Sequence, residues 1–269
     1  MTVAAPVSLV AIDESVLSSY DRAGKSGGAR SSLTPLARLG KAGVAVPEVA
    51  RALLALSNAV LAAGGDLRVT ECHRDLAVQR TARDRYDRWV AAGKPPAGSP
   101  SFDARTMKAA FVAPPGRSNH NAGRAIDLHL SMLRFPGIPA NGILDRLWEI
   151  AKPLGWSPII KAPEESASEA WHFDYWGELA GVYRRLGYEQ GALCGAVLVG
   201  HGDLSSYEAV VQSLLSRAGF DLGAIDGVAG RRTVSSLATA LRCSENDAKA
   251  KIVARDGSVL PLLAALPPG

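Results

Sequence analysis

The sequence SNHNAGRAID, residues 118–127, is followed downstream by EAWH, residues 169–172. Together they supply two histidines, one aspartate and one additional glutamate, namely His120, Asp127, His172 and Glu169. A catalytic zinc site has three such protein ligands and leaves a fourth position for water. A glutamate that does not bind the metal can take the proton of that water, whose pKa zinc lowers toward ~7. The pattern therefore predicts a zinc hydrolase.

The spacing of His120 and Asp127 indicates the local backbone. On one helix, at ~1.5 Å per residue, they would lie roughly 10 Å apart, whereas two donors to one zinc lie within about 4 Å of each other. A helix therefore cannot bring them to a shared metal. We expect a tight turn at residues 121–123, with Gly123 at positive φ, followed by a strand from Ala125.

The second motif requires a bend as well. Glu169 and His172 would point to opposite faces of a regular strand. We therefore expect the backbone to bend near Ala170 and a strand to begin at Trp171. In that strand His172 and Asp174 would share one face.

Other residues compete for the same roles. For three further histidines a structural role is favoured over metal binding: His73, His129 and His201. His129 is the nearest competitor, because it would face the same way as Asp127. Glu164 and Glu165 compete with Glu169 for the role of base, but their acidic loop is more simply a solvated surface.

Apolar periodicity and turn residues predict an α+β fold with a small, largely antiparallel sheet and flanking helices, plus a small three-helix domain. We expect helices over residues 47–63, 76–92 and 142–153, and strands over 66–71, 125–130, 155–160 and 171–176.

A different pattern follows, with a capping box at Ser205 and Glu208. Its predicted helices end at Gly219, span 231–241 and start at Ser244. The expected domains are an irregular arm over 1–45, a catalytic domain over 46–198 and a helical domain over 204–269.

Composition excludes several classes of protein. The 269 residues are 47% hydrophobic, which is ordinary for a globular protein. The net charge of +4 comes from scattered basic residues, so no nucleic-acid partner is expected. Three cysteines, Cys72, Cys194 and Cys243, cannot all pair within the chain. No secretory signal or membrane span is expected, and we expect a monomer.

The two motifs resemble those of a known family. SNHNAGRAID is similar to the Ser-x-His-x-x-Gly-x-Ala-x-Asp motif of the zinc D-alanyl-D-alanine carboxypeptidases, and EAWHFDYWG is similar to their Glu-x-Trp-His motif. The family includes VanY-type D,D-carboxypeptidases and phage endolysins that cut between L-alanine and D-glutamate. The resemblance covers about residues 47–177.

The resemblance implies roles for individual residues. His120, Asp127 and His172 would bind zinc, and Glu169 would be the general base. Arg74 would contact the substrate carboxylate or the oxyanion, and Ser118 matches the motif serine, expected to bind substrate. Two departures concern substrate choice. Glu-Cys-His precedes Arg74 where the family usually has Ser-Gly-Tyr, and Asp174 replaces a residue that is commonly basic or glutamate.

The helical segment carries a second resemblance. LLSRAGFDLGAIDGVAGRRTVSSLATAL is similar to the three-helix peptidoglycan-binding domain, and the matching positions are Gly223, Ile225, Asp226, Gly227, Gly230 and Thr233. The alternative is a helical appendage that serves folding alone. The loop lacks the Gly-Lys-Ser/Thr end of a nucleotide-binding P-loop.

Together the resemblances imply an enzyme that acts on peptidoglycan at the cell wall, in the periplasm or outside the cell. The preferred reaction is D-alanyl-D-alanine carboxypeptidase activity. The alternatives are an L-alanyl-D-glutamate endopeptidase and a cell-wall-binding protein without catalysis.

Overall fold

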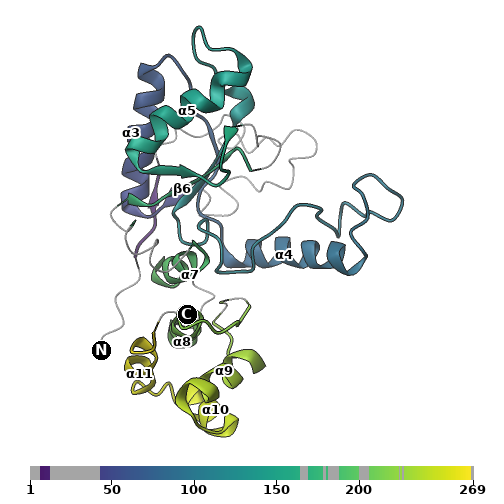
Figure 1. Cartoon of the computed structure of the whole chain (residues 1–269), viewed down its shortest axis with the longest axis vertical. Coiled ribbons are helices and arrows are strands. Elements are labelled where there is room, and N and C mark those ends of the chain that lie inside the picture. The colour runs from purple at the N-terminus through teal and green to yellow at the C-terminus, as the bar shows by residue number, and fades with distance from the viewer. Residues whose placement is uncertain are drawn as a thin grey trace. The chain divides into compact units, whose positions relative to one another are not determined.

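The computed structural model describes residues 7–12, 43–163, 169–177, 180, 188–199, 206–223, 225 and 227–267 (Figure 1). The described residues form two compact units. One unit contains Val7–Arg74 and Ala122–Arg185, and the other contains Asp75–Asn121 and Leu186–Gly269. Most of the expected arm, residues 1–6 and 13–42, lies outside the described residues. The domain boundaries 46–198 and 204–269 remain predictions.

The first unit is built on an antiparallel sheet of four strands, as predicted. In chain order they are β3 (Val69–Glu71), β4 (Ala125–Leu128), β5 (Trp156–Pro158) and β6 (His172–Tyr175). Their order across the sheet is β3-β4-β6-β5, and every neighbouring pair is antiparallel. Two short strands, β1 (Val10–Ala11) and β2 (Val44–Ala45), pair separately. Each strand of the main sheet is shorter than the sequence predicts, and β3 starts only at Val69.

Helices α3 (Pro47–Ala62) and α5 (Ile143–Ala151) belong to the same unit and contact each other (Figure 1). Pro47 occupies the first turn of α3, where its missing N–H costs nothing. The buried side chains of α3 recur every three or four residues, as in an amphipathic helix: Val49, Leu53, Leu56 and Val60. Among the described residues, the unit also contains short 3₁₀ segments at Leu130–Met132, Ala140–Gly142 and Lys152–Leu154.

The side chains of the two central strands alternate between the hydrophobic core on one face of the sheet and a polar cluster on the other. Ile126 on β4 and Phe173 on β6 are register partners, and both are fully buried. Because side chains alternate along a strand, the next pair, Asp127 and His172, projects from the opposite face. The hydrophobic pattern thus places both candidate ligands on one face.

In the described residues, the second unit contains α4 (Leu76–Ala91) and five further helices. These are α7 (Tyr188–Val199), α8 (Ser206–Arg217), α9 (Arg231–Leu241), α10 (Glu245–Val253) and α11 (Val259–Ala264). The predicted helices of the C-terminal segment correspond to α8, α9 and α10. Ser244 caps α10 as expected, since its Oγ accepts a hydrogen bond from the Asp247 N–H at 3.1 Å. Ser205, the other predicted cap, lies outside the described residues.

The sequence reasoning did not predict α7 or α11. The sequence of α7, YEQGALCGAVLV, is apolar nearly all round and includes two glycines, so it has no one-sided stripe. Helix α11 has only six residues. Its buried side chains join the core of the C-terminal helices, which includes Val211, Leu215, Leu237, Ile252 and Leu263. None of the helices in the described ranges is long and apolar enough to cross a membrane.

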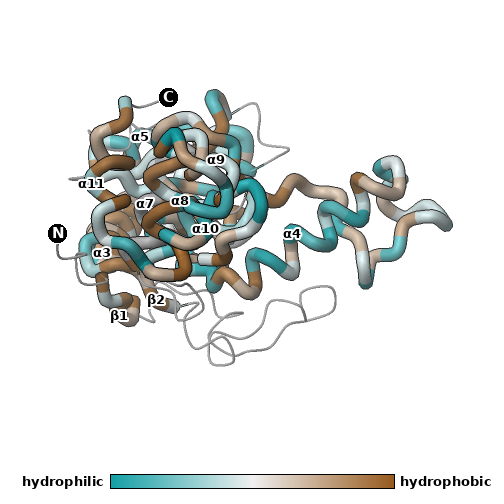
Figure 2. The backbone as a smooth tube through the Cα atoms, turned by 90° about the horizontal axis from the view of Figure 1, so that it is seen from below, coloured by the Kyte–Doolittle hydropathy of each residue, from teal (hydrophilic) through white to brown (hydrophobic). Residues whose placement is uncertain are grey.

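Helix α4 is mainly hydrophilic (Figure 2). Its buried side chains, Leu76 and Gln79, lie near its N-terminus. The long Pro/Gly/Ser loop that follows α4 is tied back to it by side-chain donors. Gln79 Nε2 donates to the Ala113 carbonyl at 2.5 Å, and Arg83 Nη1 donates to the Val112 carbonyl at 2.8 Å. This loop leads into the His120 motif.

Candidate metal centre

The motif around His120 folds into the expected turn. The Asn121 N–H donates to the Ser118 carbonyl at 2.8 Å, and the His120 N–H lies 3.3 Å from the Ser118 Oγ that accepts from it. Gly123 has a φ of +64°, the left-handed conformation predicted for it. A Cβ there would lie 3.2 Å from the Val46 N. The glycine therefore allows both the turn and the close approach of Val46.

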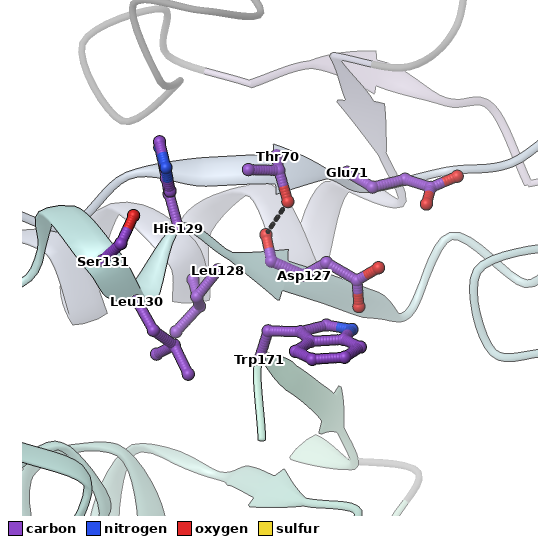
Figure 3. Close-up of a pocket in the computed structure, with 8 residues that line it drawn as sticks. All are labelled: Thr70, Glu71, Asp127, Leu128, His129, Leu130, Ser131 and Trp171. Carbon is purple, nitrogen blue, oxygen red and sulfur yellow. Dashed lines mark hydrogen bonds between the residues drawn. The ribbon is translucent and has the colours of Figure 1, made fainter. Parts of the chain in front are cut away.

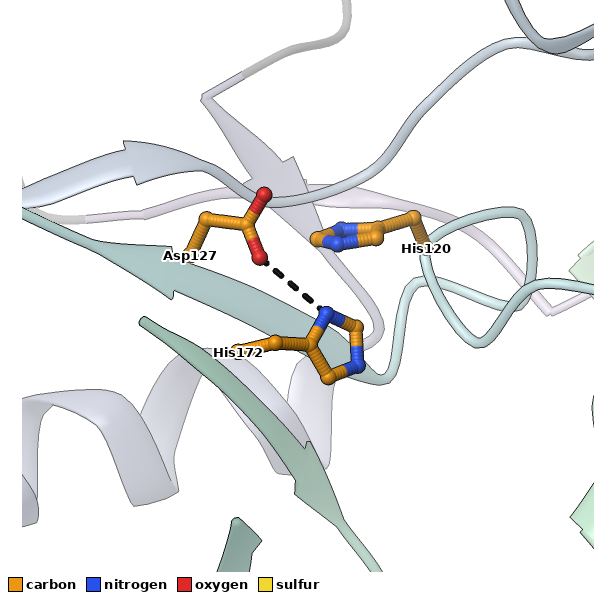
Figure 4. A group of neighbouring side chains, drawn as sticks. All are labelled: His120, Asp127 and His172. Carbon is orange, nitrogen blue, oxygen red and sulfur yellow. Dashed lines mark hydrogen bonds and ion pairs between the residues drawn. The ribbon is translucent and has the colours of Figure 1, made fainter. Parts of the chain in front are cut away.

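Three side chains converge next to this turn (Figure 4). His120, Asp127 and His172 each offer one ligand atom, and these atoms lie within 4.8 Å of one another. Both histidines are buried, at 2% and 5% exposure, and Asp127 is partly buried. Two imidazoles and a carboxylate form a nitrogen and oxygen donor set that suits zinc. The cluster could therefore hold a metal ion.

His172 lies between two carboxylates. Its Nδ1 is 3.1 Å from Asp127 Oδ1, and its Nε2 is 3.0 Å from Asp174 Oδ1. Burial alone lowers the pKa of His172, but hydrogen bonds to Asp127 and Asp174 and the charges of both carboxylates outweigh it and raise the pKa to about 10. The site thus favours positive charge at this imidazole.

Glu169 is not part of this cluster, but the backbone bends as expected beside it. Glu169 has a φ of +58°, which is uncommon for a residue other than glycine. The His172 N–H donates to the Glu169 carbonyl at 2.9 Å, and β6 begins at His172 rather than at Trp171. The Glu169 carboxylate is close enough to contribute to the electrostatic environment of Arg74.

Arg74 is hydrogen-bonded to Glu71, a residue that the sequence motifs did not identify as part of the site. Its Nε and Nη2 donate to the two carboxylate oxygens of Glu71 at 2.5 and 2.6 Å, and Nη2 is 4.0 Å from Asp127 Oδ2. Burial alone lowers the pKa of Arg74, but Glu71, Asp127 and Glu169 raise it above its ordinary value. Arg74 therefore remains a cation among three carboxylates.

Two sequence signals could have identified Glu71. It lies three residues before Arg74, and it replaces the serine of the family pattern. A third signal required the structure, because Glu71 is also the register partner of Asp127 across β3 and β4. Asp127 thus has Glu71 on one side and His172 on the other.

A pocket of about 360 Å³ opens beside Asp127 (Figure 3). It is lined by Thr70, Glu71, Asp127, Leu128, His129, Leu130, Ser131 and Trp171. Of these lining residues, Trp171 is 39% exposed. Since Asp127 belongs to both the pocket and the ligand cluster, a substrate in the pocket would lie next to the candidate metal centre.

The remaining candidates take other positions. Within the described part of the chain, His129 lines the pocket, whereas buried His73 belongs to neither the pocket nor the ligand cluster. Ser118 is 6% exposed, and its hydroxyl supports the turn. His201, Glu164 and Glu165 lie outside the described residues.

The loop before His120 contacts the loop between α8 and α9. The Ile225 N–H donates to the Pro115 carbonyl at 3.1 Å. Arg117 Nε donates to the Gly223 carbonyl at 2.5 Å, and its Nη2 donates to Ser216 Oγ at 3.3 Å. These contacts use two positions of the second resemblance, Gly223 and Ile225.

Gln212 on α8 also stabilises the loop that carries the second resemblance. The Gln212 side chain accepts from the Gly227 N–H at 2.9 Å and donates to Thr233 Oγ1 at 3.4 Å. Gly227 has a φ of +71°, which explains a glycine at this position. Asp226 of the same motif lies outside the described residues.

Residues 45–178 match the family model described as VanY, D-alanyl-D-alanine carboxypeptidase. The matched segment contains the three clustered side chains together with Arg74 and Glu169. It ends before the C-terminal helices, so the peptidoglycan-binding resemblance remains a prediction. No curated protein and no solved structure matches the chain.

Proposed function

Since residues 45–178 are a domain of the VanY family of D-alanyl-D-alanine carboxypeptidases, we propose that this protein is a zinc-dependent peptidase of peptidoglycan stem peptides. The bond that we favour is D-alanyl-D-alanine. The observation that carries the proposal is the cluster of His120, Asp127 and His172 inside the matched segment, next to an open pocket.

His120, Asp127 and His172 would hold the zinc ion. Three protein ligands suit a catalytic rather than a structural site, because a structural zinc usually has four. When bound, zinc acts as a Lewis acid and makes water a nucleophile near neutral pH.

Glu169 would act as the general base. A carboxylate in reach of the attacking water takes its proton and then passes it to the amine of the leaving residue. Its position at a bend, outside the regular strand, supports this role, because a regular strand would direct Glu169 and His172 to opposite faces.

Arg74 would stabilise negative charge on the substrate. A partly buried guanidinium that stays protonated can donate hydrogen bonds to a developing oxyanion or to a carboxylate. The bidentate contact with Glu71 fixes its orientation before substrate arrives. Ser118 is a weaker candidate for substrate binding, because its hydroxyl is buried in the turn.

One observation favours the L-alanyl-D-glutamate endopeptidase as a second candidate. Glu71 already engages two nitrogens of the Arg74 guanidinium and offsets its charge. Arg74 is then less suited to binding a terminal carboxylate, which an endopeptidase acting within a chain does not require. The loops around the pocket would decide between the two bonds.

The C-terminal helices would bind peptidoglycan. Attaching a peptidase to an insoluble polymer raises its local concentration near the bonds that it cuts. We therefore place its action at the cell wall, in the periplasm or outside the cell. We also infer a monomer, which light scattering would check.

Digestion of purified peptidoglycan, followed by mass analysis of the soluble products, tests the proposal. Free D-alanine would support the carboxypeptidase, and stem peptides that begin with D-glutamate would support the endopeptidase. If the protein sedimented with peptidoglycan and released neither product in the presence of zinc, it would instead be a cell-wall-binding protein without catalysis.

A further inference from the structure

Asp174 is a buried carboxylate in the middle of the sheet. It lies on β6 two residues after His172, so the two side chains project from the same face. Its register partners are Ala125 on β4 and Ser157 on β5, neither of which carries charge. Asp174 is 3% exposed and His172 is 5% exposed.

A buried carboxylate is costly unless a partner compensates its charge. His172 is such a partner, because its Nε2 lies 3.0 Å from Asp174 Oδ1. The carboxylate here therefore indicates a role that acts through His172.

The two ring nitrogens of His172 have different surroundings. Nδ1 faces Asp127, a member of the ligand cluster, whereas Nε2 faces Asp174. A neutral imidazole has one N–H donor and one nitrogen lone pair. If Nε2 carries the hydrogen and donates it to Asp174, then the lone pair of Nδ1 points toward the cluster. Histidines that bind metals commonly donate their second N–H to a carboxylate, which fixes the ring and strengthens the ligand.

We propose that Asp174 is a positioning residue of the metal centre, which holds His172 with Nδ1 directed at the metal and thereby sets the zinc affinity. This inference rests on the proposed zinc site, and it concerns a position where the chain departs from the family pattern. Asp174 contacts neither substrate nor metal in this role and acts through His172.

The zinc dissociation constants of the parent, Asp174→Asn and Asp174→Ala test the inference in the full chain, by competition with a chromophoric chelator. Loss of an outer-shell partner typically weakens metal binding roughly 10- to 100-fold, and we expect Asp174→Ala to fall in that range. Asp174→Asn should be weakened less, because its amide oxygen still accepts the Nε2 hydrogen. Asp145→Asn, on the exposed surface of α5, removes the same charge and should leave the affinity unchanged.

A second readout separates positioning from a general loss of structure. In zinc-loaded protein labelled with ¹⁵N-histidine, the parent and Asp174→Asn should show His172 with a protonated Nε2 and a metal-bound Nδ1. If Asp174→Ala does not fold, the comparison of Asp174→Asn with the parent decides the question.

Two results would overturn the inference in different ways. If the parent binds zinc and the folded Asp174 variants bind it equally well, then Asp174 has no part in the metal centre and the proposed function stands. If the parent itself does not bind zinc, the proposed function and this inference both fail.

Discussion

Asp127 on β4 and His172 on β6 are register partners, and their side chains meet at 3.1 Å. The pairing of the two strands therefore brings together two of the three side chains of the candidate metal centre. The neighbouring pair, Ile126 and Phe173, is fully buried and holds this register, because a slip of one residue would expose both apolar side chains. The core and the site thus depend on the same alignment of strands.

Replacement of a clustered side chain should abolish stoichiometric zinc binding. His120→Ala removes one of the three donors, and we expect the zinc affinity to fall more than about 100-fold, since even outer-shell losses cost roughly 10- to 100-fold. Metal analysis of dialysed protein measures this. His73→Ala is a matched control, because His73 is also buried but lies outside the cluster. Equal zinc content in the parent and the folded His120→Ala protein would refute the ligand assignment.

Glu169→Gln should separate catalysis from metal binding. Without a carboxylate to accept the proton, kcat on a stem peptide should fall about 10²- to 10⁴-fold while the zinc content stays the same. Glu149→Gln, at an exposed position on α5, is the control and should leave kcat unchanged. If Glu169→Gln retained the parent rate, another residue would have to serve as base.

Glu71→Ser should change substrate choice. The substitution restores the serine of the family pattern and releases the two hydrogen bonds that Glu71 accepts from Arg74. Arg74 would then bind a terminal carboxylate more readily, so KM for a D-alanyl-D-alanine peptide should fall about tenfold or more, as expected for one hydrogen bond to a charged group.

The control for this prediction is the same peptide with an amidated C-terminus, on which Glu71→Ser should have little effect. Arg74→Lys in the Glu71→Ser background should remove the gain, because lysine lacks the bidentate geometry. An equal change of KM for both peptides would show that Glu71 does not act through the carboxylate.

Protonation of Asp256 in strong acid should make the C-terminal helices less stable. Hydrogen bonds from Ser258, followed by that from Lys251, lower the pKa of Asp256 to about 2 from 3.8. Because the folded-state pKa is depressed, the stabilisation is present above the ordinary pKa and is lost as the pH falls through about 2.

Asp256→Asn should therefore unfold more readily than the parent at pH 6, and the difference should disappear near pH 2. Hydrogen exchange of the Ser258 amide, which donates to Asp256 Oδ1 at 2.9 Å, reports this locally. Asp221→Asn is the control, since the Asp221 side chain is 83% exposed. A difference that persisted unchanged to pH 2 would contradict the assignment.

Local features of the chain were readable from sequence because each has a local cause. The predicted helix over 47–63 corresponds to α3, because Pro47 suits its first turn and Gly64, with a φ of +79°, suits the position after its end. The turn could be predicted from the spacing of His120 and Asp127, because Gly123 can adopt a positive φ. Helix α7 escaped prediction because it has no one-sided apolar stripe.

The sequence by itself therefore determined the kinds of group available, the turn at Gly123, the bend near Ala170 and the family of residues 45–178. Only the tertiary structure decided how these groups are paired across the sheet. Strand register is a long-range property, and it placed Asp127 between Glu71 and His172. Burial makes the interactions of these carboxylates matter more for stability, because a carboxylate removed from water needs a partner within the protein.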